Sequence, residues 1–204
     1  MILIGGYRSP FVRRVAITLR LYGLAHKHRP LSGADPEQRT ELKTINPLAR
    51  VPALVTDDEG TLVDSATILD YLDRRVGPDK ALIPAGGSER TRVMALIGLS
   101  VGAIEKSIAE YYERGKRPEE KWHRPWMEQL LEQSKDGFAA VEDLAQAPWL
   151  TGDRMTQADV STVAFWDFAL RNRPSDAPAV DCPKLAALSE RANAMPAFAE
   201  TNPY

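Results

Sequence analysis

"SPFVRRVAITLRLYGL" (residues 9–24) has the pattern of a helix that follows directly on a strand. Ser9 followed by Pro10 is a typical helix start, because serine caps the first free amides and proline needs no amide partner there. Apolar residues then recur at helical spacing and form one buried stripe. The preceding "MILI" (1–4) is fully apolar, as in a buried strand. This stretch therefore predicts an α/β unit.

The same alternation continues to residue 77. "HKHRPL" (26–31) is compatible with an outer strand, and "DPEQRTELKTIN" (35–46) has a capped, acidic helix start. "PALVT" and "TLVD" flank "DDEG" (57–60), which predicts an antiparallel hairpin. "SATILDYLDRRVG" (65–77) predicts another helix, with Ser65 as its N-cap. The resulting order is strand, helix, strand, helix, hairpin, helix, which is typical of helices packed on a small mixed sheet.

The second half contains no strand signal. "GPDKALIPAGGS" (77–88) is rich in Gly and Pro, and the apolar periodicity after it predicts helices at 89–115, 126–145, 157–171 and 184–194. Thr156 and Asp159 are spaced as a capping box for the third of these. We therefore expect an α/β domain at 1–76, a linker at 77–87 and an all-helical domain at 88–204.

Composition excludes several classes of function. The net charge of −2 gives no reason to expect a nucleic acid or an anionic membrane as partner. The most apolar segment, 93–104, is too short to span a bilayer, and no signal peptide is recognisable at the start. Cys182 is the only cysteine, and the three histidines are dispersed, so we expect a cytoplasmic protein without a metal site.

Three short motifs leave a structural and a functional interpretation open. The hydroxyl of Ser9 caps a helix, and it is also able to donate a hydrogen bond to a ligand thiolate, for which Tyr7 is a competing donor. Pro52 stands at a strand start, where a turn at "RVP" leaves the Val51 backbone free to pair with an extended peptide. Asp64 and Ser65 cap a helix, and together they also suit the ammonium and carboxylate groups of an amino acid.

Taken together, these motifs resemble a cytosolic glutathione S-transferase over nearly the whole chain. The resemblance rests on "SPFVRRV" after the first strand, "NPLARVPAL" (46–54), "DSATILDYLD" (64–73), "LIP" (82–84) and "TQADV" (156–160). It implies a thioredoxin-like N-terminal domain of order βαβαββα, an all-helical C-terminal domain and a homodimer. It also implies glutathione as co-substrate.

The resemblance further implies roles for single residues. Ser9 would contact the glutathione sulfur, and Val51, before a cis Pro52, would pair with the cysteinyl backbone. Asp64 and Ser65 would hold the γ-glutamyl end, and Arg50 would approach the glycyl carboxylate. A pocket for the electrophile is expected next to the sulfur. The residues expected to line that pocket are Tyr7, Ala103, Ser107 and Tyr111.

The expected activity is transfer of glutathione to small, mostly apolar electrophiles. Because Ser9 stands where redox relatives carry cysteine, disulfide exchange is disfavoured. The alternatives are a non-catalytic binding or interaction protein with the same fold, and another glutathione-dependent reaction such as isomerisation, dehalogenation or peroxide reduction.

Overall fold

The computed structural model describes residues 1–175, 177 and 180–204, and they form two compact units. The first unit comprises residues 1–85 and 193–204, and the second comprises residues 86–192. No helix in the described part of the chain is long and apolar enough to cross a bilayer.

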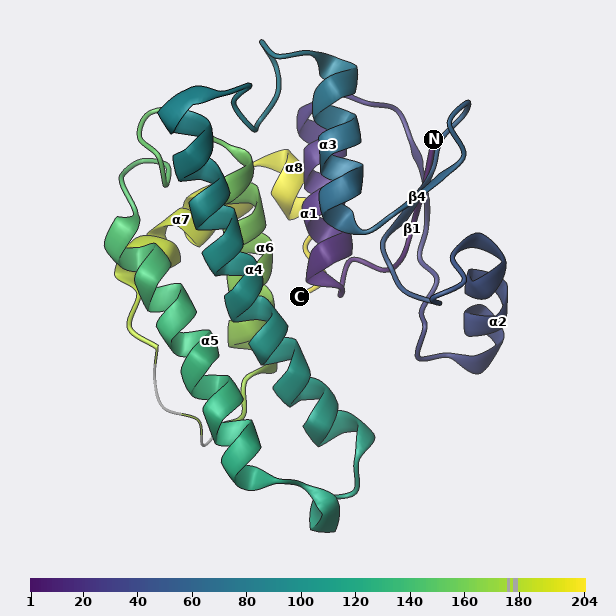
Figure 1. The fold of residues 1–204 in the computed structure, drawn as a ribbon, viewed down its shortest axis with the longest axis vertical. Helices are drawn as coiled ribbons and strands as arrows, with labels where there is room; N and C mark the ends of the chain where they lie inside the picture. Colours follow the sequence, from purple (N-terminus) through teal and green to yellow (C-terminus); the bar gives the residue numbers. More distant parts are fainter. Residues whose placement is uncertain (176, 178–179) are drawn as a thin grey trace. The chain divides into compact units, whose positions relative to one another are not determined.

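The first unit is built on a four-stranded sheet of order β2-β1-β3-β4. β1 (Ile2–Ile4) runs parallel to β2 (Lys27–Arg29) and antiparallel to β3 (Ala53–Val55), which pairs with β4 (Thr61–Val63). The helices are α1 (Pro10–Leu21), α2 (Pro36–Ile45) and α3 (Ser65–Val76) (Figure 1). The predicted order of strands and helices in this half is confirmed.

Side-chain alternation along the strands separates two apolar layers. Leu3 and Leu54 point to one face and are buried with apolar residues of α1 and α3. Ile4 and Ala53 point to the other face and are buried with Leu42 of α2. The sheet is therefore covered on both faces, which explains why "MILI" contains no polar residue.

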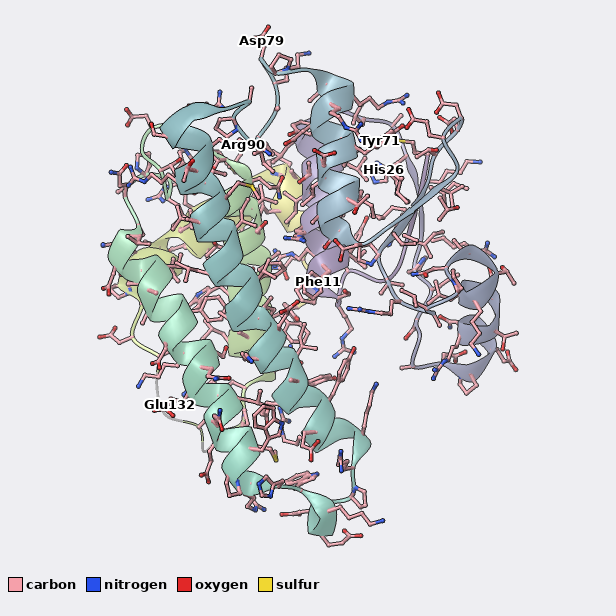
Figure 2. All side chains as sticks on the ribbon, viewed as in Figure 1. Phe11, His26, Tyr71, Asp79, Arg90 and Glu132 are labelled. Atoms are coloured by element: carbon pink, nitrogen blue, oxygen red, sulfur yellow. The ribbon has the colours of Figure 1, made fainter. Side chains whose placement is uncertain are left out.

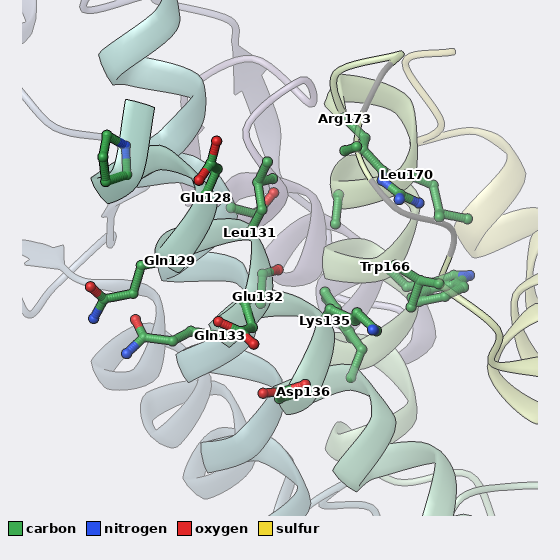
Figure 3. Close-up of a pocket in the computed structure, with 17 residues that line it drawn as sticks. Glu128, Gln129, Leu131, Glu132, Gln133, Lys135, Asp136, Trp166, Leu170 and Arg173 are labelled. Carbon is green, nitrogen blue, oxygen red and sulfur yellow. The ribbon is translucent and has the colours of Figure 1, made fainter. Parts of the chain in front are cut away.

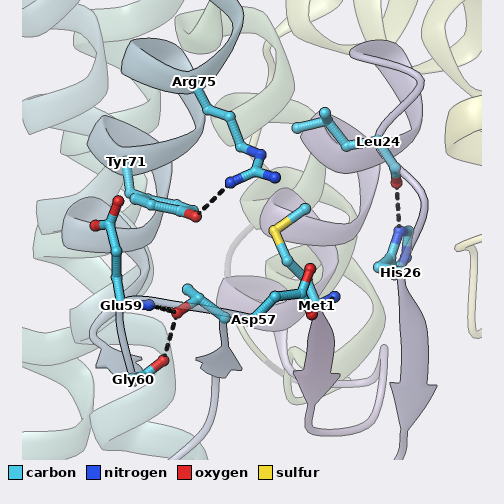
Figure 4. A network of polar contacts seen from close by, with 9 residues as sticks. Met1, Leu24, His26, Asp57, Glu59, Gly60, Tyr71 and Arg75 are labelled. Carbon is cyan, nitrogen blue, oxygen red and sulfur yellow. Dashed lines mark hydrogen bonds and ion pairs between the residues drawn. The ribbon is translucent and has the colours of Figure 1, made fainter.

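The polar groups at one end of the sheet satisfy one another, as Figure 4 shows. The Met1 ammonium contacts the Asp57 carboxylate at 2.8 Å. The Thr56 hydroxyl donates to the Gly60 carbonyl at 2.8 Å and accepts from the Glu59 amide at 2.9 Å, which closes the β3–β4 turn. This end of the sheet is stabilised by its own side chains.

The second unit contains α4 (Gly87–Lys116), the short helix η1 (Glu119–Lys121), α5 (Arg124–Leu144), α6 (Gln157–Asn172) and most of α7 (Pro183–Asn193). The Phe138 and Trp166 rings meet edge to face with centroids 5.2 Å apart. At the start of α6 the Asp159 carboxylate accepts hydrogen bonds from the Thr156 amide and hydroxyl and from the Leu150 amide, as the capping signal predicts. Burial raises the pKa of Asp159 above its ordinary value.

The first compact unit includes more residues than the α/β domain expected at 1–76. The Leu82 amide donates to the Tyr22 hydroxyl at 2.7 Å, which ties the expected linker to α1. The short helix α8 (Pro196–Ala199) packs on α1, and Arg20 and Glu200 form an ion pair. Residues 77–85 and 193–204 therefore fold with the first unit, held by contacts between residues far apart in the sequence.

Candidate functional site

The sheet register gathers the predicted site segments at one end of the first unit. Ile4 pairs with Ala53, and Ala53 pairs with Val63. Ile4 and Val63 are the last residues of β1 and β4, and Ala53 is the first residue of β3. The segment after β1, the turn before β3 and the start of α3 therefore lie at the same end of the sheet. This end is opposite to the one that the Met1–Asp57 contact closes.

Ser9 caps α1 as predicted. Its backbone is extended, with φ −74° and ψ 120°, and its Oγ accepts from the Val12 amide at 3.4 Å. The Ser9 amide donates to the Gly6 carbonyl at 3.0 Å, which holds the residue in place. Since the hydroxyl accepts from Val12, its own hydrogen is free to donate outward from a partly exposed position. The contact with a sulfur stays a prediction.

Tyr7 is held by a contact that the sequence does not signal. Its ring stacks on His28 with centroids 4.1 Å apart and 3° between the planes. The His28 Nε2 lies 2.7 Å from the Gly5 carbonyl oxygen. The Tyr7 ring is thus placed against β2, whereas Ser9 occupies the N-terminus of α1, where the helix dipole favours an anion.

The Val51–Pro52 peptide bond is cis. β3 begins only at Ala53, and in the part of the chain that the structure describes the Val51 amide and carbonyl have no hydrogen-bond partner. The predicted turn with a free Val51 backbone is therefore present. Arg50 is exposed, and its part in binding a carboxylate stays a prediction.

Asn46 organises this turn, and sequence analysis missed it. Its side chain is buried, donates to the Arg50 carbonyl at 2.8 Å and accepts from the Leu48 amide at 3.0 Å. Ala49, between these residues, has a positive φ of 49°. The only signal in the sequence is Asn before Pro, which indicates a turn without saying what the amide holds.

The cap of α3 is Asp64, which corrects the prediction that Ser65 is the N-cap. The Asp64 carboxylate accepts from the Ala66 amide at 2.8 Å, and Asp64 has a φ of 70°. Ser65 is the first residue of the helix and is buried, and its Oγ accepts from Arg14 Nη2 at 2.6 Å. Asp64 is exposed beside it.

The remaining predicted pocket residues lie on α4 in the second unit. Ala103 is buried where α4 crosses α5, so close that a Cβ added to Gly137 would lie 2.8 Å from the Ala103 Cβ. Tyr111 meets Phe168 of α6 edge on, with centroids 5.8 Å apart. Ala103 therefore packs within the second unit, Ser107 is buried as well, and Tyr111 is half-buried. The part of these residues in binding an electrophile stays a prediction.

Ser107 lines a cavity of about 1000 Å³ within the second unit. Figure 3 shows its walls, which come from α5 and the C-terminal part of α6. Apolar side chains such as Leu131 and Trp166 lie beside charged ones such as Glu132 and Arg173. The mixture of charges selects no single class of ligand, and none of the predicted glutathione-binding residues lines it.

The described residues offer neither an exposed thiol nor a cluster of metal ligands. Cys182 is buried, and its surroundings raise the pKa of the thiol to about 11, through burial first and then through the carboxylates of Glu142, Asp181 and Asp143. The described residues contain no cluster of His, Cys, Asp and Glu suited to a metal ion.

Comparison with known proteins supports the resemblance along the chain. The family model for the glutathione S-transferase N-terminal domain matches residues 3–80, and that for the C-terminal domain matches residues 104–200. The chain is 32% identical to maleylacetoacetate isomerase of Pseudomonas aeruginosa, over 97% of this chain and 93% of that protein. It is also 32% identical to a zeta-class glutathione S-transferase of Euphorbia esula, over 76% of this chain and 69% of that protein.

A solved structure gives the same result for the fold. A glutathione transferase family member from Pseudomonas fluorescens Pf-5, with bound glutathione, is 29% identical and superposes with a TM-score of 0.83. The match covers 100% of this chain and 98% of that one. The two-domain architecture with a thioredoxin-like first domain is confirmed, and the chain belongs to the glutathione S-transferase family.

Proposed function

We propose that this protein binds glutathione at the free end of its sheet and stabilises the glutathione thiolate at Ser9. The observation that carries the proposal is the register that brings Ser9, Val51 and the Asp64–Ser65 pair to one end of the sheet. Each offers a different group: a hydroxyl at a helix N-terminus, an unpaired backbone, and a carboxylate beside a second helix start.

These groups match the parts of glutathione. The Val51 amide and carbonyl pair with the cysteinyl backbone, as in addition of a strand. The Asp64 carboxylate accepts from the γ-glutamyl ammonium, and Ser65 donates to the adjacent carboxylate. Arg50 attracts the glycyl carboxylate. This arrangement places the sulfur against Ser9.

The chemistry is thiolate stabilisation. A hydrogen bond from Ser9 and the dipole of α1 lower the pKa of the bound thiol, and the thiol proton leaves to solvent. The thiolate then attacks an electrophilic carbon, a sulfur–carbon bond forms, and the leaving group departs with its electron pair. Ser9 forms no covalent bond, so positioning and electrostatics supply the rate enhancement.

The resemblance to maleylacetoacetate isomerase over almost the full length favours a second candidate reaction. In a glutathione-dependent cis–trans isomerisation the thiolate adds to a conjugated double bond, the former double bond rotates, and elimination releases glutathione unchanged. The same Ser9 site serves both reactions, so the residues of the first unit do not separate them. In either case we place the enzyme in the cytoplasm as a homodimer.

Calorimetric titration with glutathione, with S-methylglutathione in parallel, tests the site. We expect saturable binding of both. Absence of binding would overturn the proposal and favour a non-catalytic interaction protein. Incubation with glutathione and either an aryl halide or a cis-configured conjugated dicarboxylic acid then separates the reactions, because only conjugation consumes glutathione.

A further inference from the structure

The segment between β1 and α1 places Ser9, and its sequence "GGYRS" (5–9) begins with two glycines. Glycine restricts the backbone less than any other residue, so this segment gains little order from its own sequence. The Ser9 amide donates to the Gly6 carbonyl at 3.0 Å, and a Cβ added to Gly6 would meet no atom within 4 Å. The position of Ser9 therefore depends on contacts that hold the residues around Gly6.

The outer strand β2 holds Gly5 through both of its backbone groups. The Gly5 amide donates to the Arg29 carbonyl at 2.9 Å, and the His28 Nε2 lies 2.7 Å from the Gly5 carbonyl oxygen. A carbonyl oxygen only accepts, so the His28 Nε2 must carry a proton and donate. His28 is itself fixed in β2, where it pairs with Leu3 of β1. Its side chain is thus a rigid support for the start of the segment.

The same imidazole holds Tyr7, two residues before Ser9. The two rings are stacked with 3° between their planes. Tyr7 is half-buried, and its ring also packs against the apolar cluster that contains Val12 of α1. The Tyr7 hydroxyl, in contrast, has no hydrogen-bond partner in the part of the chain that the structure describes. The protein therefore holds Tyr7 by its ring and not by its hydroxyl.

The strand order separates this stacked pair from the Val51 turn. β1 lies between β2, which carries His28, and β3, which follows the turn. Neighbouring strands are about 4.8 Å apart, so β2 and β3 are about 10 Å apart. The proposed function pairs the cysteinyl part of glutathione with Val51, on the other side of β1 from His28. The stack therefore keeps the Tyr7 ring on the β2 side and leaves the sulfur to Ser9.

We propose that Tyr7 and His28 are positioning residues, and that their stacked rings hold residues 5–9 so that the Ser9 hydroxyl is directed at the glutathione sulfur. The inference rests on the proposed function, since it takes Ser9 as the donor to the thiolate. Both rings act through Ser9 and do not need to touch the sulfur. The proposal also decides between the two donors that the sequence leaves open, because it gives Tyr7 a role for its ring and none for its hydroxyl.

The test measures the thiol pKa of glutathione bound to the full-length protein, from the ultraviolet absorbance of the thiolate. His28→Ala removes both the stack and the contact with Gly5. It should raise the bound thiol pKa by about 0.5–1 unit, because the hydrogen bond from Ser9 is weakened. Affinity for S-methylglutathione should change less than about threefold, which shows that the site remains folded.

Substitutions of Tyr7 separate its ring from its hydroxyl. Tyr7→Leu removes the stack and should raise the bound thiol pKa in the same direction as His28→Ala, by a smaller amount. Tyr7→Phe keeps the ring and lacks the hydroxyl, so it should leave the bound thiol pKa unchanged. If His28→Ala does not fold, the comparison of Tyr7→Leu with Tyr7→Phe tests the same contact.

A double variant separates positioning from general loosening of the site. Because the stacked pair acts through the Ser9 hydroxyl, it should have no effect once that hydroxyl is removed. Ser9→Ala/His28→Ala should therefore show the same bound thiol pKa as Ser9→Ala, since residues that act through one group are not additive. Loosening that does not involve Ser9 would add to the effect of Ser9→Ala.

His26→Ala is the matched control for replacing a histidine of this segment. The His26 Nδ1 also contacts a carbonyl oxygen, that of Leu24, at 2.9 Å. Figure 4 shows this contact at the end of the sheet where Met1 lies. Figure 2 labels His26 and, at the start of α1, Phe11, and the two lie toward opposite ends of the first unit. The control should leave the bound thiol pKa unchanged.

Three results would overturn the positioning role while leaving glutathione binding intact. They are a raised pKa in Tyr7→Phe, an unchanged pKa in His28→Ala, and an effect of His28→Ala that adds fully to that of Ser9→Ala. A loss of S-methylglutathione affinity in Tyr7→Leu as large as the change in the thiol would overturn it as well. A wild-type protein that does not bind glutathione would overturn the proposed function, and this inference with it.

Discussion

Replacing Gly5 with alanine tests how tightly the candidate site is packed. Gly5 follows β1 and has a φ of +120°, a conformation that residues with a Cβ rarely adopt. A Cβ built there would lie 2.6 Å from the Val12 Cγ2 and 2.7 Å from the Val51 Cβ. Both distances are well below van der Waals contact, and both neighbours belong to segments that form the site. The substitution therefore pushes against α1 and against the Val51 turn together.

The two effects can be given magnitudes. A residue held in a disfavoured backbone region costs about 1–3 kcal/mol, and overpacking a tight contact costs about 1–3 kcal/mol more. The sum, about 2–6 kcal/mol, is a large part of a typical stability of about 5–15 kcal/mol. With a urea dependence of about 2 kcal/mol per molar, the unfolding midpoint should fall by about 1–3 M.

Gly23→Ala is the matched control, because Gly23 also has a positive φ, +65°, but a Cβ there meets no atom within 4 Å. It should lower stability by only about 1–2 kcal/mol. The assay is urea unfolding followed by circular dichroism, with glutathione affinity measured in parallel. If the midpoint of Gly5→Ala falls no further than that of Gly23→Ala, the close contact with Val12 and Val51 does not exist.

Other predictions concern single polar groups. Asn46→Ala should destabilise the protein by about 1–3 kcal/mol and weaken glutathione binding, since it leaves the Arg50 carbonyl and the Leu48 amide unpaired; unchanged unfolding and binding would contradict its role in the turn. Burial raises the pKa of Asp73 above its ordinary value, so protonation favours the folded state, and this group's contribution to stability rises as pH falls through the folded pKa. Asp73→Asn has no carboxyl group to protonate. When the pH is lowered from 7 to 4.5, the free energy of unfolding of the wild type, measured in urea, should therefore rise relative to that of Asp73→Asn. A fall relative to Asp73→Asn would show that the pKa of Asp73 is not raised. Cys182, with a thiol pKa of about 11, should resist alkylation at pH 8 in the folded protein and react once urea unfolds it; rapid alkylation without urea would refute its burial.

Local signals in the sequence were sufficient to predict the order of the elements from β1 to α3. Ser9–Pro10 and Asp35–Pro36 each combine an N-cap with a proline at the first helical position, and α1 and α2 begin there. The hairpin around Gly60 follows from turn chemistry in the same way. Each of these signals involves residues that are neighbours in the sequence, and the predicted local structure is therefore present in the fold.

Features that depend on contacts between distant segments could not be predicted. Asp64 and Ser65 are both good caps, and only the backbone that the fold imposes on Asp64 decides between them. Arg13 is buried, and Asn193, far from it in the sequence, accepts its hydrogen bond. The same holds for the side chain of Asn46, whose partners become visible only when the turn is folded.

The central claim is that Ser9 stabilises a glutathione thiolate, and the pKa of the bound thiol tests it most directly. The measurement is a titration of enzyme-bound glutathione followed by the ultraviolet absorbance of the thiolate, in the wild type and in Ser9→Ala. Affinity for S-methylglutathione verifies that the site remains folded. The account predicts a bound thiol pKa clearly below the free value of about 8.5 in the wild type, and a rise of about 1–2 units in Ser9→Ala. An identical pKa in both proteins would show that Ser9 only caps its helix.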